Sequence, residues 1–146
     1  MATASKEEEE LRKLSVEMRF LEQTAESLQQ RISMVNAAMT DLAYANMALE
    51  SIENEKEHAE LLVPIGGSSY IKVKLASSDK VIVGMGANVS IEKTLPEAKA
   101  IVKERLEELE KTMRSAQQQF GQVAQRINAG RTRVESLLAT VRQGTA

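Results

Sequence analysis

VPIGGSSYIKVKL, residues 63–75, has the pattern of a β-hairpin inside a chain that otherwise has helical periodicity. A Gly-Gly-Ser turn is followed by apolar residues that alternate with Lys72 and Lys74, as in a strand with one apolar face. A second stretch of the same kind, VIVGMGANVSIEK, follows at residues 81–93. We expect strands at 61–65, 69–76, 80–85 and 88–94.

These hairpins are too small to be stable alone, and their open strand edges favour pairing with other strands. They also present more apolar surface than a thin pair of helices would cover. The residues of this expected assembly surface are Ile71, Val73, Leu75, Val81, Val83, Met85, Val89 and Ile91. We therefore expect the hairpins to pair with hairpins of other subunits and to close a sheet or barrel.

Both segments that flank the hairpins have apolar residues in alternating steps of three and four, the a/d pattern of a coiled coil. The first series runs from Leu11 to Leu49 and the second from Val102 to Val141. Because the two series have similar lengths, they favour an antiparallel two-helix coiled coil within one chain over a parallel dimer. The predicted fold is mainly α, with two central β-hairpins between the helices.

Each heptad series has one interruption. Asn46 is interpreted as a polar residue that fixes the register, and Gly130 as a place of weaker packing or a bend. Thr94 and Glu97 have the spacing of a capping box at the start of the second helix. Antiparallel folding would also bring the acidic residues 7–10 near a set of arginines, namely Arg131, Arg133 and Arg142.

Composition excludes several classes of protein. The 146 residues carry a formal net charge of −2, so they lack the basic surface of a nucleic-acid-binding protein. No apolar run approaches the ~20 residues needed to span a membrane. The acidic start, MATASKEEEE, differs from a secretory signal, and cysteine is absent. We expect a cytoplasmic protein without disulfides.

Catalytic groups are scarce. His58, the only histidine, lies among charged residues where the first helix should end, and we interpret it as a solvated side chain. Gly84 and Gly86 begin like a dinucleotide-binding loop, but the third glycine is missing and a strand follows. The carboxylates lie mainly on outward helical faces. We expect no enzyme activity, no catalytic residues, no cofactor and no metal site.

The order helix, two hairpins, helix resembles an alpha-class subunit of prefoldin, with LLVPIGGSSYIKVKL (61–75) and KVIVGMGANVSIEKTLPEA (80–98) as the specific matches. The resemblance covers nearly the whole chain and implies one domain, 1–146. Its parts would be a helix at 6–58, hairpins at 59–94 and a helix at 95–142. It also implies a heterohexamer of two alpha and four beta subunits joined through a double β-barrel. Such a complex captures non-native polypeptides without ATP and passes them to a group II chaperonin.

In such a complex the outer ends of the helices would contact unfolded client proteins, because helix ends fray and leave apolar residues partly wet. Val16, Phe20 and Leu138 lie outside the heptad core positions, where a simple coiled coil has polar residues. The full set of candidate client-contact residues is Leu11, Leu14, Val16, Met18, Phe20, Val134, Leu137, Leu138 and Val141.

Two alternative functions are compatible with the same pattern of helices and hairpins. A structural coiled-coil scaffold would need the hairpins only to form oligomers, but it would not explain apolar residues near the helix ends. A filament-forming relative of prefoldin would assemble without a beta-class partner. An enzyme is a distant third because reactive groups are missing.

Overall fold

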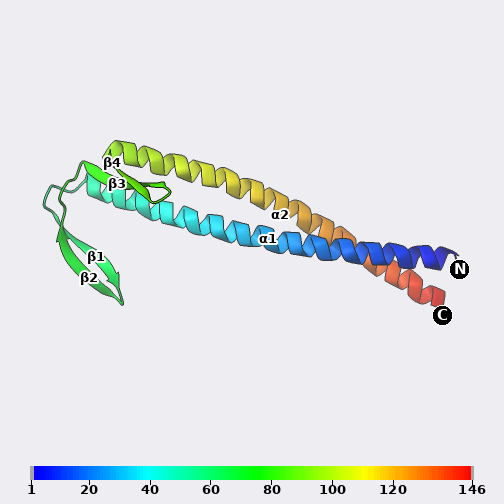
Figure 1. Cartoon of the computed structure of the whole chain (residues 1–146). Helices are drawn as coiled ribbons and strands as arrows, with labels where there is room; N and C mark the ends of the chain where they lie inside the picture. Colours follow the sequence, from blue (N-terminus) through cyan, green and yellow to red (C-terminus); the bar gives the residue numbers. More distant parts are fainter. Residues whose placement is uncertain (1, 146) are drawn as a thin grey trace. The chain divides into compact units, whose positions relative to one another are not determined.

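The computed structural model describes the backbone of residues 2–145 and the side chains of residues 6–144. In the order of the sequence, two β-hairpins lie between two long helices (Figure 1). The elements, in order, are α1 (Ala2–Glu53), β1 (Glu60–Gly66), β2 (Ser69–Lys74), β3 (Lys80–Gly86), β4 (Val89–Thr94) and α2 (Leu95–Thr145). The predicted fold of two long helices with two central hairpins is confirmed.

The chain divides into two compact units. The first contains Met1–Asn36 and Lys111–Ala146, and the second contains Ala37–Glu110. Both helices therefore contribute to both units, whereas all four strands belong to the second.

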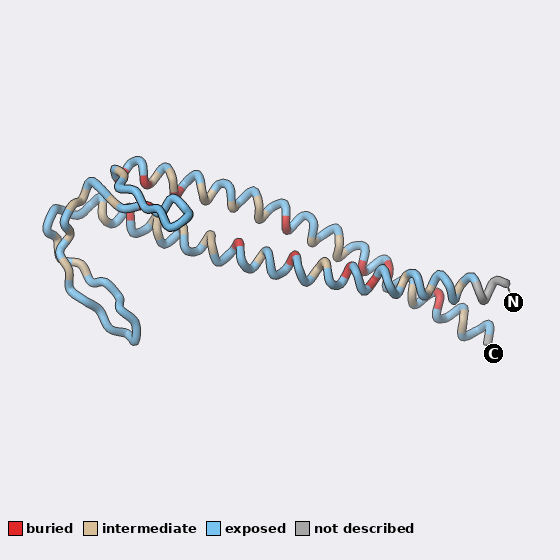
Figure 2. Tube along the Cα trace, in the orientation of Figure 1, coloured by how far each residue is buried: buried red, intermediate tan, exposed pale blue. Residues whose placement is uncertain are grey.

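In the first unit, α1 and α2 pack antiparallel through the predicted heptad core positions. Met18, Leu21 and Ile127 form a buried cluster, against which Leu14 and Val123 pack. Every predicted core position of this unit is buried or half-buried, and residues between them are mainly exposed (Figure 2). The apolar periodicity thus determines which stripe of each helix faces the other.

The hairpins form two separate two-stranded antiparallel sheets. In β1–β2, Leu61 pairs with Val73, and in β3–β4, Val83 pairs with Ile91. Both turns have two loop residues with positive φ angles, including Ala87 at 50°. Such turns match the twist of antiparallel strands, and they explain the Gly-Gly-Ser and Gly-Ala-Asn stretches.

The core of the second unit joins β3 to both helices. Leu49 of α1, Val83 of β3 and Val102 of α2 belong to one buried cluster. Val81 packs against the same cluster and is half-buried. Hairpin β3–β4 is consequently held by the chain's own helices along one face.

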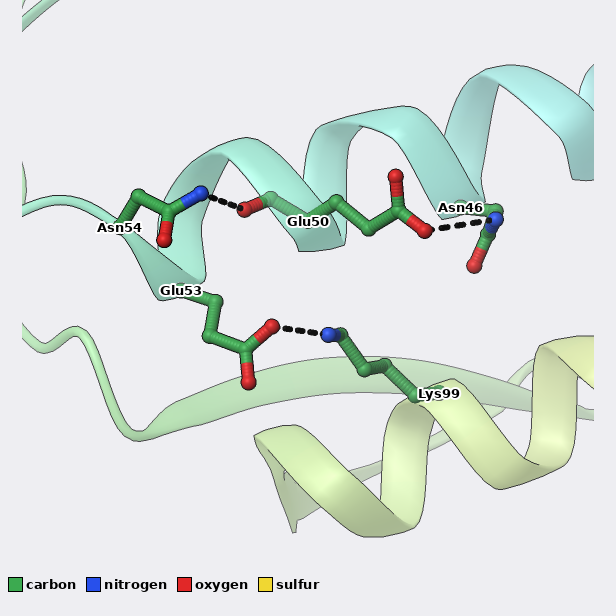
Figure 3. Close-up of polar contacts among 5 residues, drawn as sticks. All are labelled: Asn46, Glu50, Glu53, Asn54 and Lys99. Atoms are coloured by element: carbon green, nitrogen blue, oxygen red, sulfur yellow. Dashed lines mark hydrogen bonds and ion pairs between the residues drawn. The ribbon is translucent and has the colours of Figure 1, made fainter.

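The end of α1 is fixed by polar contacts (Figure 3). The side-chain amide of Asn54 donates to the carbonyl oxygen of Glu50 at 3.2 Å, and Glu53 forms an ion pair with Lys99 of α2. Asn46, the polar residue in the first heptad series, is half-buried, and its amide lies 3.4 Å from a Glu50 carboxylate oxygen. The helix ends at Glu53, earlier than the expected boundary at residue 58.

The second helix begins where the sequence predicts. The Thr94 hydroxyl accepts a hydrogen bond from the Glu97 backbone N–H at 3.3 Å, which is the contact of an N-cap residue. The Leu95 N–H also donates to the carbonyl oxygen of Asp79 at 2.9 Å. These bonds satisfy two backbone donors of the first turn and connect α2 to the loop before β3.

Candidate assembly surface and client-contact residues

Hairpin β1–β2 carries apolar side chains that remain largely exposed. Val63 and Ile71 are opposite each other in the register and both are exposed, whereas the neighbouring pair Leu61 and Val73 is half-buried. Figure 2 shows this hairpin as exposed along nearly its whole length. Its apolar face therefore lacks cover within the chain, as at a surface that pairs with another molecule.

The predicted assembly residues fall into two groups. Val83 is buried against the chain's own helices and Val81 is half-buried there. The other residues of the set remain available to a partner to different degrees, with Val73 and Leu75 half-buried and the rest exposed. The exposed ones are Ile71, Met85, Val89 and Ile91. The surface is thus concentrated on β1–β2 and on the outer parts of β3–β4.

Sequence reasoning missed further exposed apolar residues on the hairpins. These are Leu62, Val63, Ile65, Tyr70 and Ile82. The signal was present in β1, where Leu61, Leu62 and Val63 form a continuous apolar run. Because successive strand residues point to opposite faces, such a run places apolar side chains on both faces of β1.

At the outer ends of the helices, only three of the predicted client-contact residues are exposed. Val16 and Phe20 of α1 are 70% and 67% exposed, and Leu138 of α2 is 36% exposed. The heptad positions place Val16 and Phe20 together on the outer face of α1, one turn apart, and Leu138 on the flank of α2.

The other candidates take part in the contact between the helices. Met18 and Leu137 are buried, and the remaining four are half-buried. These four are Leu11, Leu14, Val134 and Val141. These four side chains keep part of their surface accessible, whereas Met18 and Leu137 are covered in the contact between the helices.

Ion pairs connect the helices on one flank of this region. Arg133 donates from Nε and Nη2 to the two carboxylate oxygens of Glu10, at 2.9 and 3.1 Å, and Arg126 lies 3.5 Å from Glu17. All four side chains are about half exposed or more, so each pair contributes little stability and is weakened by salt. The expected approach of acidic residues to arginines is found at Glu10 and Arg133.

Other chemistry is sparse in the described part of the chain. Residues 6–144 contain no group of three acidic or histidine side chains placed to hold a metal ion, and no helix is apolar enough along its length to cross a membrane. His58 is exposed and has a φ angle of 67°.

The Ser77 hydroxyl donates to Asp79 and holds the pKa of that exposed carboxyl below its ordinary value.

Comparison with known proteins identifies the family. Residues 21–140 match the prefoldin subunit family. The chain belongs to the prefoldin family. Prefoldins are chaperones, and membership gives this prefoldin chain a role in protein folding.

Individual relatives agree with the alpha class. The prefoldin subunit alpha of Methanococcoides burtonii is 32% identical over 134 residues, covering 92% of this chain and 89% of the relative. That of Nitrosopumilus maritimus is 31% identical over 135 residues, covering 84% and 93%. The fold is similar to that of a filamentous PFD from Methanocaldococcus jannaschii, with a TM-score of 0.66 and 24% identity over 76% of this chain and 92% of that chain.

Proposed function

We propose that this chain is the alpha subunit of an ATP-independent chaperone that holds unfolded polypeptides. It would assemble with beta-class subunits through its hairpins, as two alpha and four beta subunits, and would pass its clients to a group II chaperonin. The observation that carries this proposal is the exposed apolar surface of β1–β2, which has the pairing capacity of a strand but lacks a partner in the chain.

Assembly would cover the exposed apolar strands of the isolated chain. Two-stranded sheets are marginal in water, and apolar strands with open edges aggregate. Pairing β1 and β2 with strands of neighbouring subunits would bury the cross-strand pair Val63 and Ile71 and would satisfy the open edges. A closed barrel achieves this without leaving a new edge.

Client binding would then depend on many weak contacts. The exposed pair Val16 and Phe20 offers a small apolar patch near the outer end of α1. Burial of ~100 Å² of apolar surface contributes ~2.5 kcal/mol before entropic costs, which is too little to hold a client firmly. Several such ends around one client would raise the effective concentration, so capture would need no sequence specificity and release would stay possible.

Co-purification with a beta-class subunit tests the proposal, followed by mass measurement and an aggregation assay on a chemically denatured enzyme. The expected result is a hexamer that slows aggregation without ATP. An assembled complex that does not slow aggregation would support a scaffold. A large assembly formed by the chain alone would support a filament former.

A further inference from the structure

The two hairpins differ in how the chain holds them. Hairpin β3–β4 is anchored at its base, where the Leu95 N–H donates to Asp79, and along its length, where Val83 is buried against Leu49 and Val102. Hairpin β1–β2 contributes no residue to either buried cluster of the described chain. The orientation of β3–β4 is therefore a property of the chain itself.

Apolar packing alone constrains this orientation incompletely. A pocket of about 310 Å³ lies between β3 and the helices. On the helical side its lining combines three alanines, Ala45, Ala48 and Ala98, with the larger side chains of Leu42, Leu49 and Val102. Because this pocket is open to solvent, apolar packing does not fill the whole boundary between β3 and the helices, and a polar contact there would add to the hold on the hairpin.

Arg105 of α2 supplies that contact. Its Nη2 atom donates a hydrogen bond of 2.7 Å to the carbonyl oxygen of Gly84 in β3 and lies 4.0 Å from the Met85 sulfur. Arg105 is half-buried and lines the same pocket. Among the described side chains, no carboxylate forms an ion pair with Arg105, so the strand carbonyl is its observed polar partner.

We propose that Arg105 is a positioning residue for subunit assembly, which holds β3–β4 against α2 before a partner binds. With Val83 fixed toward the helices, strand alternation directs its neighbour Ile82 outward, where it is 76% exposed. The surface would then be ordered before a partner binds, so the free energy of binding would not include the cost of ordering it. This inference rests on the proposed assembly through the hairpins.

The test compares Arg105→Met with Arg105→Lys and with Lys103→Met. Methionine keeps an apolar stem over the pocket but removes every donor, whereas lysine keeps one charged donor. Lys103 is an exposed residue of the same helix and serves as the matched control. For each variant, hydrogen exchange of residues 81–93 is measured on the isolated chain, and the dissociation constant is measured with a beta-class subunit.

Arg105→Met is expected to exchange these amides roughly ten-fold faster and to weaken assembly roughly ten-fold, the effect of losing one charge-assisted hydrogen bond. Arg105→Lys should recover part of both effects, and Lys103→Met should match the natural chain. Unchanged exchange, or unchanged assembly, in Arg105→Met would overturn the inference, and weaker assembly without faster exchange would indicate a direct contact with the partner instead. If the natural chain itself does not assemble, the proposed function fails, while the exchange measurement still decides whether Arg105 holds the hairpin.

Discussion

The Met18 sulfur occupies the space in which a β-carbon of residue 130 would lie, and the Met18 Cγ and Cε atoms are 3.5 Å from that position. Gly130 is buried, and α2 continues as a helix on both sides of it. The glycine therefore interrupts the apolar series because the opposite helix fills its place with a methionine. The Met18 side chain thus packs into the space that the missing side chain at position 130 leaves free.

Gly130→Ala should lower the free energy of unfolding by about 1 kcal/mol. Alanine gains about 1 kcal/mol of helix propensity, but the displaced Met18 side chain costs about 1–3 kcal/mol through overpacking. Gly121→Ala is the matched control, because nothing lies near a β-carbon there, and it should raise the same free energy by about 0.5–1 kcal/mol. Urea denaturation followed by circular dichroism measures both.

The pair Met18→Ala and Gly130→Ala completes this test. If the clash with Met18 is the cause, Gly130→Ala should become stabilising in the Met18→Ala background, since space is then free. Equal effects of Gly130→Ala in both backgrounds would show that the methionine is not responsible.

Replacing Val16 and Phe20 with serine should weaken client holding and leave assembly intact. The two side chains form the largest exposed apolar pair near the outer end of α1 among the described residues, and they lie outside the contact between the helices. Loss of about 1–2 kcal/mol of binding should require roughly 5- to 30-fold more chaperone for the same suppression of aggregation. Light scattering of an aggregating, chemically denatured enzyme gives this concentration.

Met34→Ser provides the control for position. Met34 is exposed on α1 like Val16 and Phe20 but lies farther from the helix end. An equal loss of activity in Met34→Ser would show that apolar exposure along the whole helix matters, and unchanged activity in the double serine variant would remove this pair from the client surface.

Ser77→Ala should raise the pKa of Asp79 toward its ordinary value, because the serine hydroxyl stabilises the charged carboxylate. The lowered pKa in the folded chain means that the contact stabilises the fold above the ordinary pKa of aspartate and is lost as the pH falls through the lower folded value. Titration of the Asp79 side chain by NMR measures the shift. A pKa that does not respond to Ser77→Ala would assign the shift to the backbone around Asp79.

Much of the fold could be predicted because its signals are periodic. The steps of three and four from Leu11 to Leu49 identify the buried stripe of α1, and the turn residues Gly67 and Asn88 mark the hairpins. The end of α1 was less predictable. Glu55 and Lys56 suit a helix as well as a turn, and the change of direction is fixed by contacts outside this segment, including the bond from the His58 N–H to the Leu75 carbonyl.

The alternation of apolar and polar residues in a strand does not predict whether its apolar face packs against the chain's own helices or stays exposed. Val83 and Ile71 have the same pattern in the sequence, yet Val83 is buried against the helices and Ile71 is exposed. The difference depends on small residues such as Ala98, which bring β3 close to α2, and these carry no strand signal of their own. The contact between Arg105 and Gly84 joins residues far apart in sequence and has no local signature.

Hairpin β1–β2 is proposed to join the subunits, and a comparison of Ile71→Asp with Lys72→Asp tests this role. These neighbours lie on opposite faces of β2, so each variant places a carboxylate on one face only. Lys72→Asp changes the net charge by two units and Ile71→Asp by one, so charge alone would not explain a loss seen only in Ile71→Asp. The mass of each complex with a beta-class subunit is measured by light scattering, with circular dichroism to confirm that the helices persist. We expect Ile71→Asp to stay at the 16.1 kDa mass of one chain and Lys72→Asp to assemble like the natural chain. Normal assembly of Ile71→Asp would contradict this role.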